Sequence, residues 1–114
     1  MARAHAHLLR LLKPQGRPLR TDWPHLLGSL AEVCGHRSEQ STAVLRKAAT
    51  FQGKLLLDRE RGLPHSMSPE DFLRSVAVQT LGRWNRTLHR DVIVRATALA
   101  DHECVLTYAR PYLP

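Results

Sequence analysis

Prolines and glycines divide this chain into five segments, each with apolar residues at helical spacing. Pro14 follows the first segment, Gly35 the second, Gly62 the third and Pro111 the last. Because proline cannot continue a helix and glycine often ends one, these positions indicate where helices stop. The predicted helices cover residues 2–13, 23–35, 39–61, 69–90, where Gly82 is a candidate break, and 91–110.

Two of these helices follow residues that cap helix N-termini. Ser38 precedes the third helix, and the run SPED at 68–71 begins the fourth. In that run Ser68 is the expected N-cap and Pro69 the first helical residue, where a missing N–H costs nothing. Asp71 then occupies the position of a capping-box acid. The fourth helix therefore has the best-defined start in the sequence.

The composition favours helices over strands. Of the 114 residues 43% are hydrophobic but only 5% are aromatic, and Leu and Ala, which are good helix formers, are abundant. The length suits one domain with one core. We therefore predict an all-α fold, a single compact bundle of about five helices spanning residues 1–114, with residues 1–20 as a basic N-terminal helix and loop.

The location of the protein is predicted from absences in the sequence. No apolar run reaches the about 20 residues of a membrane helix, and Cys34 and Cys104 form no CxxC pair. Separated cysteines within apolar helical patterns are typical of reduced, buried thiols. We predict a cytoplasmic protein without membrane contact. The first 21 residues contain no acidic residue, so an organelle-targeting segment stays open as an alternative.

The charge balance predicts an acidic partner. The formal net charge is +7, and 14 of the 17 basic residues are arginines. Guanidinium groups bind phosphate with two parallel hydrogen bonds and stack on bases. A basic domain of this kind suits nucleic acid, an anionic surface or an acidic protein.

The sequence lacks the patterns of common enzymes. His5 and His7 point to different faces of the first helix, and there is no HExxH or paired CxxC motif for zinc. The run DHEC at 101–104 holds an acid, a base and a thiol, but neighbouring residues on a helix diverge by about 100°. Phosphate-binding glycine loops are also absent. We predict no catalytic residues, no metal and no cofactor.

Donor side chains recur in two stripes without interleaved acids. In the third predicted helix a seven-residue spacing joins Gln40, Lys47, Lys54 and Arg61, with Arg46 beside them. In the fourth, steps of four and three join Gln79, Arg83, Arg86 and Arg90. Such steps correspond to about 5–10 Å along a helix, a spacing that suits nucleotide phosphates. Trp84 lies in the second stripe, either as a stacking platform or as a core or interface anchor.

Three stretches resemble the small subunit of type III CRISPR–Cas effector complexes, in particular the Csm-type subunit. RTDWPHLLGSL (20–30) resembles an early helix led by threonine, and AATFQGKLLLDRERG (48–62) resembles the central basic helix. ATALADHECVLTYARPY (96–112) resembles the last helix, which ends near an aromatic residue. The N-terminal helix has no clear counterpart, and residues 82–90 are more basic than the family pattern.

The resemblance implies a non-catalytic subunit of a ribonucleoprotein. Copies would stack along the effector complex and contact other subunits, each other, and RNA as a guide–target duplex or single strand, through phosphates. On the matching stretch Lys54 and Arg61 would contact RNA. The stripes, and not the resemblance, predict further nucleic-acid-binding residues: Lys47, Arg46, Arg83, Arg86 and Arg90.

Two alternatives stay open at this stage. One is a helical protein–protein adaptor whose arginines coat the surface and whose Trp23 or Trp84 anchors an interface. The other is a small DNA-binding regulator, although no helix-turn-helix pattern is evident.

Overall fold

A computed structural model of the chain describes residues 2–13, 19–58, 67–100, 105, 107 and 109–113. The described elements are α1 (Ala2–Leu12), β1 (Leu19–Asp22), α2 (Trp23–Gly35), α3 (Glu39–Ala49), β2 (Leu55–Asp58), α4 (Pro69–Asn85), α5 (Arg90–Leu99) and the 3-10 turn η1 (Arg110–Tyr112). The prediction of a mainly helical bundle is confirmed. Its radius of gyration is 13.0 Å, close to the about 13 Å of a compact domain of 100 residues.

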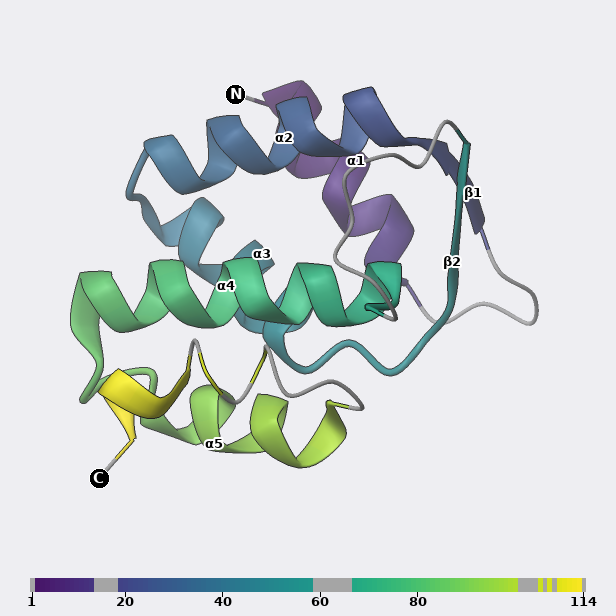
Figure 1. The fold of residues 1–114 in the computed structure, drawn as a ribbon. Coiled ribbons are helices and arrows are strands. Elements are labelled where there is room, and N and C mark those ends of the chain that lie inside the picture. Colours follow the sequence, from purple (N-terminus) through teal and green to yellow (C-terminus); the bar gives the residue numbers. More distant parts are fainter. Residues whose placement is uncertain are drawn as a thin grey trace.

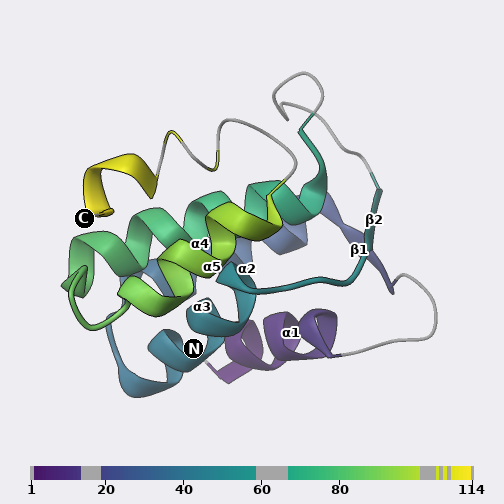
Figure 2. The ribbon, with the colours of Figure 1, turned by 90° about the horizontal axis from the view of Figure 1, so that it is seen from below.

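The helices pack around α3 and α4. Helix α3 lies against α4, and α5 contacts both of them, while α1 packs against α2 and α3. Figure 1 shows α2 and α4 crossing the molecule one above the other, with α5 below and the two strands at one side. In the view turned by 90°, α5 crosses in front of α4, and the C-terminal turn lies above the end of α4 that leads into α5 (Figure 2). The α4–α5 connection lies at the end of the bundle opposite the strands.

The core is mainly aliphatic, with Trp23 and Phe51 also buried in it. Leu8 and Leu11 of α1, Leu26 of α2 and Leu45 of α3 are each no more than 1% exposed. Each fully buried side chain of this size contributes about 1.5–3 kcal/mol relative to an exposed one. This burial, more than intrinsic propensity, holds helices of 10 to 17 residues.

The third helix is shorter than predicted. It begins at the Ser38 cap, whose Oγ accepts a hydrogen bond from the Ser41 N–H at 3.0 Å, but it ends at Ala49 and not near residue 61. The chain then forms β2, which pairs in parallel with β1 in the register Leu19 to Leu55. The prediction of a helix is wrong over residues 50–58, because this stretch leaves the helix to complete a short sheet.

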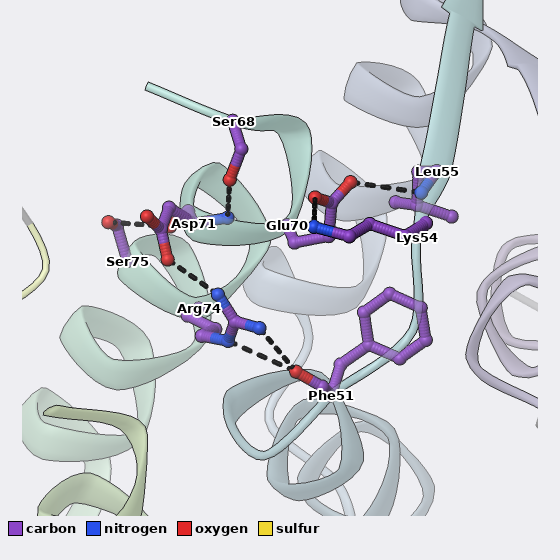
Figure 3. Close-up of polar contacts among 8 residues, drawn as sticks. All are labelled: Phe51, Lys54, Leu55, Ser68, Glu70, Asp71, Arg74 and Ser75. Carbon is purple, nitrogen blue, oxygen red and sulfur yellow. Dashed lines mark hydrogen bonds and ion pairs between the residues drawn. The ribbon is translucent and has the colours of Figure 1, made fainter. Parts of the chain in front are cut away.

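Buried polar contacts from α4 hold the segment that follows α3 (Figure 3). Arg74, only 6% exposed, donates from Nε and Nη2 to the Phe51 carbonyl at 3.1 and 2.7 Å. Its Nη1 donates to Asp71 Oδ1 at 2.5 Å. Glu70 accepts from the Leu55 N–H at 2.9 Å. These bonds replace those that a continued helix would make, which explains why the chain can turn away after residue 49.

The start of α4 is as predicted, whereas its end is not. Ser68 Oγ accepts from the Asp71 N–H at 3.1 Å, with Pro69 as the first helical residue. Gly82 does not break the helix, which continues to Asn85. Leu88, predicted to lie on the apolar face, is instead 64% exposed in the turn that follows.

The predicted last helix is also interrupted. Helix α5 ends at Leu99, because Ala100 is extended at φ −75° and ψ 141°. Val105, Thr107 and Ala109 are helical again before η1. The DHEC run and Cys104 lie outside the described residues, as does Arg61.

Candidate nucleic-acid interface

The turn between α4 and α5, residues 86–89, is built by local hydrogen bonds. The Asn85 side-chain oxygen accepts from the Leu88 N–H at 3.1 Å, and the Asn85 carbonyl accepts from the His89 N–H at 3.1 Å. The His89 carbonyl in turn accepts from the Ile93 N–H at 3.1 Å. Because Ile93 is fully buried, the turn is fixed to the core at its α5 end.

Arg46 of α3 fastens this turn from the side. Its Nη1 and Nη2 donate to the two carboxylate oxygens of Asp91 at 3.1 and 2.5 Å. Nη1 also lies 3.0 Å from Nδ1 of His89, and since arginine is always protonated, this ring nitrogen accepts. That Arg46 binds nucleic acid stays a prediction, and in the structure its guanidinium is already paired. Arg46 is a bidentate clamp between α3 and α5, and its charge is matched by Asp91.

The clamp shifts the ionisation of its partners. The hydrogen bond from Arg46 is the main reason that the pKa of Asp91 is lowered. The pKa of His89 is also lowered, first by burial and then by the neighbouring charge of Arg46. Both shifts favour the same state, in which a carboxylate and a neutral imidazole accept from one guanidinium.

Three arginines of the second predicted stripe surround this fixed turn. Arg83 lies in the last turn of α4, Arg86 caps that helix, and Arg90 is the first residue of α5. All three are exposed. Among the described residues, their guanidinium groups have no hydrogen-bond or ion-pair partner. The stripe does not follow one helix as predicted, since the turn separates Arg83 from Arg90.

Arg86 and Arg90 line one surface cleft. The cleft has a volume of about 350 Å³, and its lining is completed by Thr87, Tyr112 and Leu113. No carboxylate is present in this lining as far as the chain is described. Two unpaired guanidinium groups in a lining without a carboxylate have the chemistry to bind an anion.

The first predicted stripe is not assembled. Lys47 is exposed on α3, whereas Lys54 lies beyond the end of that helix. The ammonium group of Lys54 is 3.9 Å from Oε1 of the buried Glu70 (Figure 3). Lys54 is still 72% exposed, so this pair is weak, but its charge is already partly matched. The single continuous seam predicted from Gln40 to Arg61 does not exist, because its helix ends at residue 49.

The aromatic residue at the cleft is Tyr112 and not a tryptophan. Trp23 is buried and packs edge-on against Phe72, with ring centroids 5.0 Å apart. Trp84 is half-buried against the core. Sequence reasoning did not identify Tyr112 as a residue of the cleft. No local pattern indicates this position, because Tyr112 lies beside Gly82 of α4 only through tertiary packing.

The described residues show no cluster of metal ligands and no thiol with a lowered pKa. No group of three or more His, Cys, Asp or Glu in these ranges could hold a metal ion. Thr80 donates to the Cys34 sulfur at 3.3 Å, and burial raises the pKa of this thiol, which opposes its use as a nucleophile. Within the described part of the chain no helix is both long and apolar enough to cross a membrane.

Comparison of the chain with protein-family models, curated proteins and solved structures found no match. The features that bear on function are therefore the fold and the cleft lined by Arg86 and Arg90, which we call the arginine cleft.

Proposed function

We propose that this chain is a non-catalytic protein that binds the backbone of nucleic acid without reading its sequence. The observation that carries the proposal is the arginine cleft. Arg86 and Arg90 line it, Arg83 lies one helical turn before Arg86, and all three guanidinium groups are unpaired among the described residues.

The physical argument rests on charge and rigidity. The chain carries a net charge of +7, which attracts a polyanion from a distance. At the cleft, guanidinium groups can each form two hydrogen bonds with one phosphate. The clamp made by Arg46, His89 and Asp91 fixes the backbone that carries these arginines. Phosphate contacts give affinity and register but carry no base information.

The proposal is tested by removing the two arginines of the cleft. We expect Arg86→Ala with Arg90→Ala to weaken binding of a labelled oligonucleotide, measured by fluorescence anisotropy over a range of salt concentrations. On a single strand each phosphate contact contributes about 0.7 to the slope of log K against log salt. The double variant should therefore lower the magnitude of the slope by about 1.4.

A charge-matched control separates the cleft from overall charge. Arg10 of α1 and Arg95 of α5 are exposed and lie outside the cleft lining. Arg10→Ala with Arg95→Ala removes the same two charges and should leave the slope close to that of the wild type. Equal losses in both double variants would show that net charge, and not the cleft, determines binding.

A narrower proposal is that the chain is a small subunit of a CRISPR-type ribonucleoprotein effector complex, where it lies beside other subunits and copies of itself. This proposal rests on the sequence resemblance. Of the stretch 20–30, residues 20–22 lie in β1 and residues 23–30 in α2, whereas 48–62 and 96–112 are not continuous helices in their described parts. Lys54, which the resemblance assigns to RNA contact, is exposed but shares its charge with Glu70.

One observation favours an adaptor as the second candidate. Leu88, in the α4–α5 turn, is 64% exposed beside a second cleft of about 520 Å³. A single exposed leucine is common on protein surfaces, so the support for an interface comes from its position in the lining of this cleft. Leu88→Ser would then remove a co-purifying protein partner without changing the affinity for an oligonucleotide. If the nucleic-acid affinity falls instead, Leu88 belongs to the nucleic-acid interface and the adaptor is excluded.

A further inference from the structure

The C-terminal turn η1 places an aromatic ring beside the arginine cleft. Ala109, which precedes η1, is fully buried, and the Leu113 N–H donates to the Arg110 carbonyl at 3.3 Å. The hydrogen bond closes the turn, and the turn lies beside the C-terminal part of α4 in both ribbon views (Figures 1 and 2). Tyr112 lies within this turn and lines the cleft with Arg86.

Gly82 supports one face of the Tyr112 ring. A Cβ placed on Gly82 would lie 2.5 and 2.7 Å from the two Cδ atoms of the ring. These nearly equal distances put the α-carbon of Gly82 beneath the face of the ring and not at its edge. Only glycine allows the helix backbone and the ring to approach so closely. Tyr112 is half-buried and packs partly against the core, with Gly82 behind one face of the ring, and it contributes to the cleft lining.

We propose that Tyr112 is a stacking platform for a nucleobase, so that the cleft takes an unpaired nucleotide of a single strand. Arg86 and Arg90 hold its phosphates, and the ring receives its base. Bases in a duplex are stacked on their neighbours and cannot lie flat on a protein ring. This inference rests on the proposed function and deepens it, because it selects a single strand over a duplex at this cleft.

Two features favour stacking of a base on Tyr112: Gly82 lies behind the ring, and guanidinium groups line the same cleft. An aromatic ring that is held in place loses little conformational freedom when a base stacks on it. Guanidinium groups beside the ring add cation–π attraction and can themselves stack on bases. The platform is tolerant of sequence, because every base has a π-face. Stacking therefore agrees with binding that does not read sequence.

The test compares a base-containing strand with an abasic strand of equal length. Binding of labelled oligouridine and of its abasic analogue is measured for the wild type, Tyr112→Ala, Tyr112→Phe and Pro111→Ala. Loss of one stacked base weakens binding by about 5- to 160-fold. We expect that loss for Tyr112→Ala on oligouridine alone, with no change on the abasic strand. Tyr112→Phe should retain wild-type binding, as should Pro111→Ala, because Pro111 is an exposed residue of the same turn that lies outside the cleft lining.

The outcomes separate this inference from the proposed function. If the wild type binds both strands equally and Tyr112→Ala changes neither affinity, the stacking inference is overturned while backbone binding stands. If neither strand binds in a salt-dependent way, both proposals fail. If Tyr112→Ala and Pro111→Ala weaken both strands alike, the C-terminal turn acts only as structural support and the stacking inference is again overturned.

Discussion

Substitution of Arg74 by methionine tests why the chain leaves the helical path after residue 49. Methionine keeps much of the length and the apolar stem of arginine but removes every donor. In the wild type, the Arg74 guanidinium satisfies the Phe51 carbonyl and the Asp71 carboxylate. Asp71 is only 1% exposed, so Arg74→Met leaves a buried carboxylate without this counter-charge.

The expected magnitude follows from this burial. Removing one partner of a buried ion pair costs about 3–5 kcal/mol. A domain of this size has a total stability of about 5–15 kcal/mol, so a large share of the free energy of unfolding should be lost. Replacing both partners, as Asp71→Asn with Arg74→Met, should cost less than the sum of the single changes.

The assay is urea denaturation followed by circular dichroism, with the four proteins of the cycle measured together. Arg95→Met is the matched control, because Arg95 is an exposed arginine on a helix and should change stability by no more than about 0.5 kcal/mol. An Arg74→Met protein within about 1 kcal/mol of the wild type would refute the reasoning, as would strictly additive effects of the two substitutions.

Two further predictions concern α1 and the C-terminal turn. The pKa of His7 is lowered to about 4, first by burial, then by His25 and Arg10, so the unfolded chain binds a proton at this site that the folded chain does not. The free energy of unfolding should therefore fall as pH drops from 6.5 toward 4, and His7→Gln should flatten that dependence in urea titrations. An unchanged pH dependence in this variant would contradict the burial argument. His89→Gln should also flatten the pH dependence, since the pKa of His89 is lowered as well. Gly82→Ala should displace the Tyr112 ring, which hydrogen exchange would detect as faster exchange of the Leu113 N–H with α4 still protected. Unchanged exchange at Leu113 would mean that the turn does not depend on Gly82.

The sequence predicted the starts of helices better than their ends. Ser38 and Ser68 cap α3 and α4 as expected, because a side chain that satisfies the first N–H groups is a local signal. The end of α3 at Ala49 carried no such signal. Phe51 and Leu55 continue the apolar spacing of the helix, and both are buried, but in a loop and a strand. Periodicity alone cannot distinguish these cases.

The sequence predicted which arginines of the candidate site are exposed, but it did not predict which charges are paired or which ring lies beside the cleft. Arg83, Arg86 and Arg90 are exposed as expected. Arg46 is matched by Asp91, which is 45 residues away in the chain, so its pairing depends on how α3 and α5 pack. The contact between Tyr112 and Gly82 likewise depends on how the C-terminal turn packs beside α4. Tertiary packing determines which charges are matched and which ring lies beside them, and neither follows from spacing.

The central claim is that the chain holds nucleic acid within a larger assembly. The most direct measurement is gentle, low-salt purification of the tagged protein from its native host, with the particle size and the ratio of absorbance at 260 and 280 nm read before and after ribonuclease treatment. The account predicts a large particle, rich in nucleic acid and containing further subunits, that shrinks when the RNA is digested. A small species free of nucleic acid, unaffected by nuclease, would contradict it.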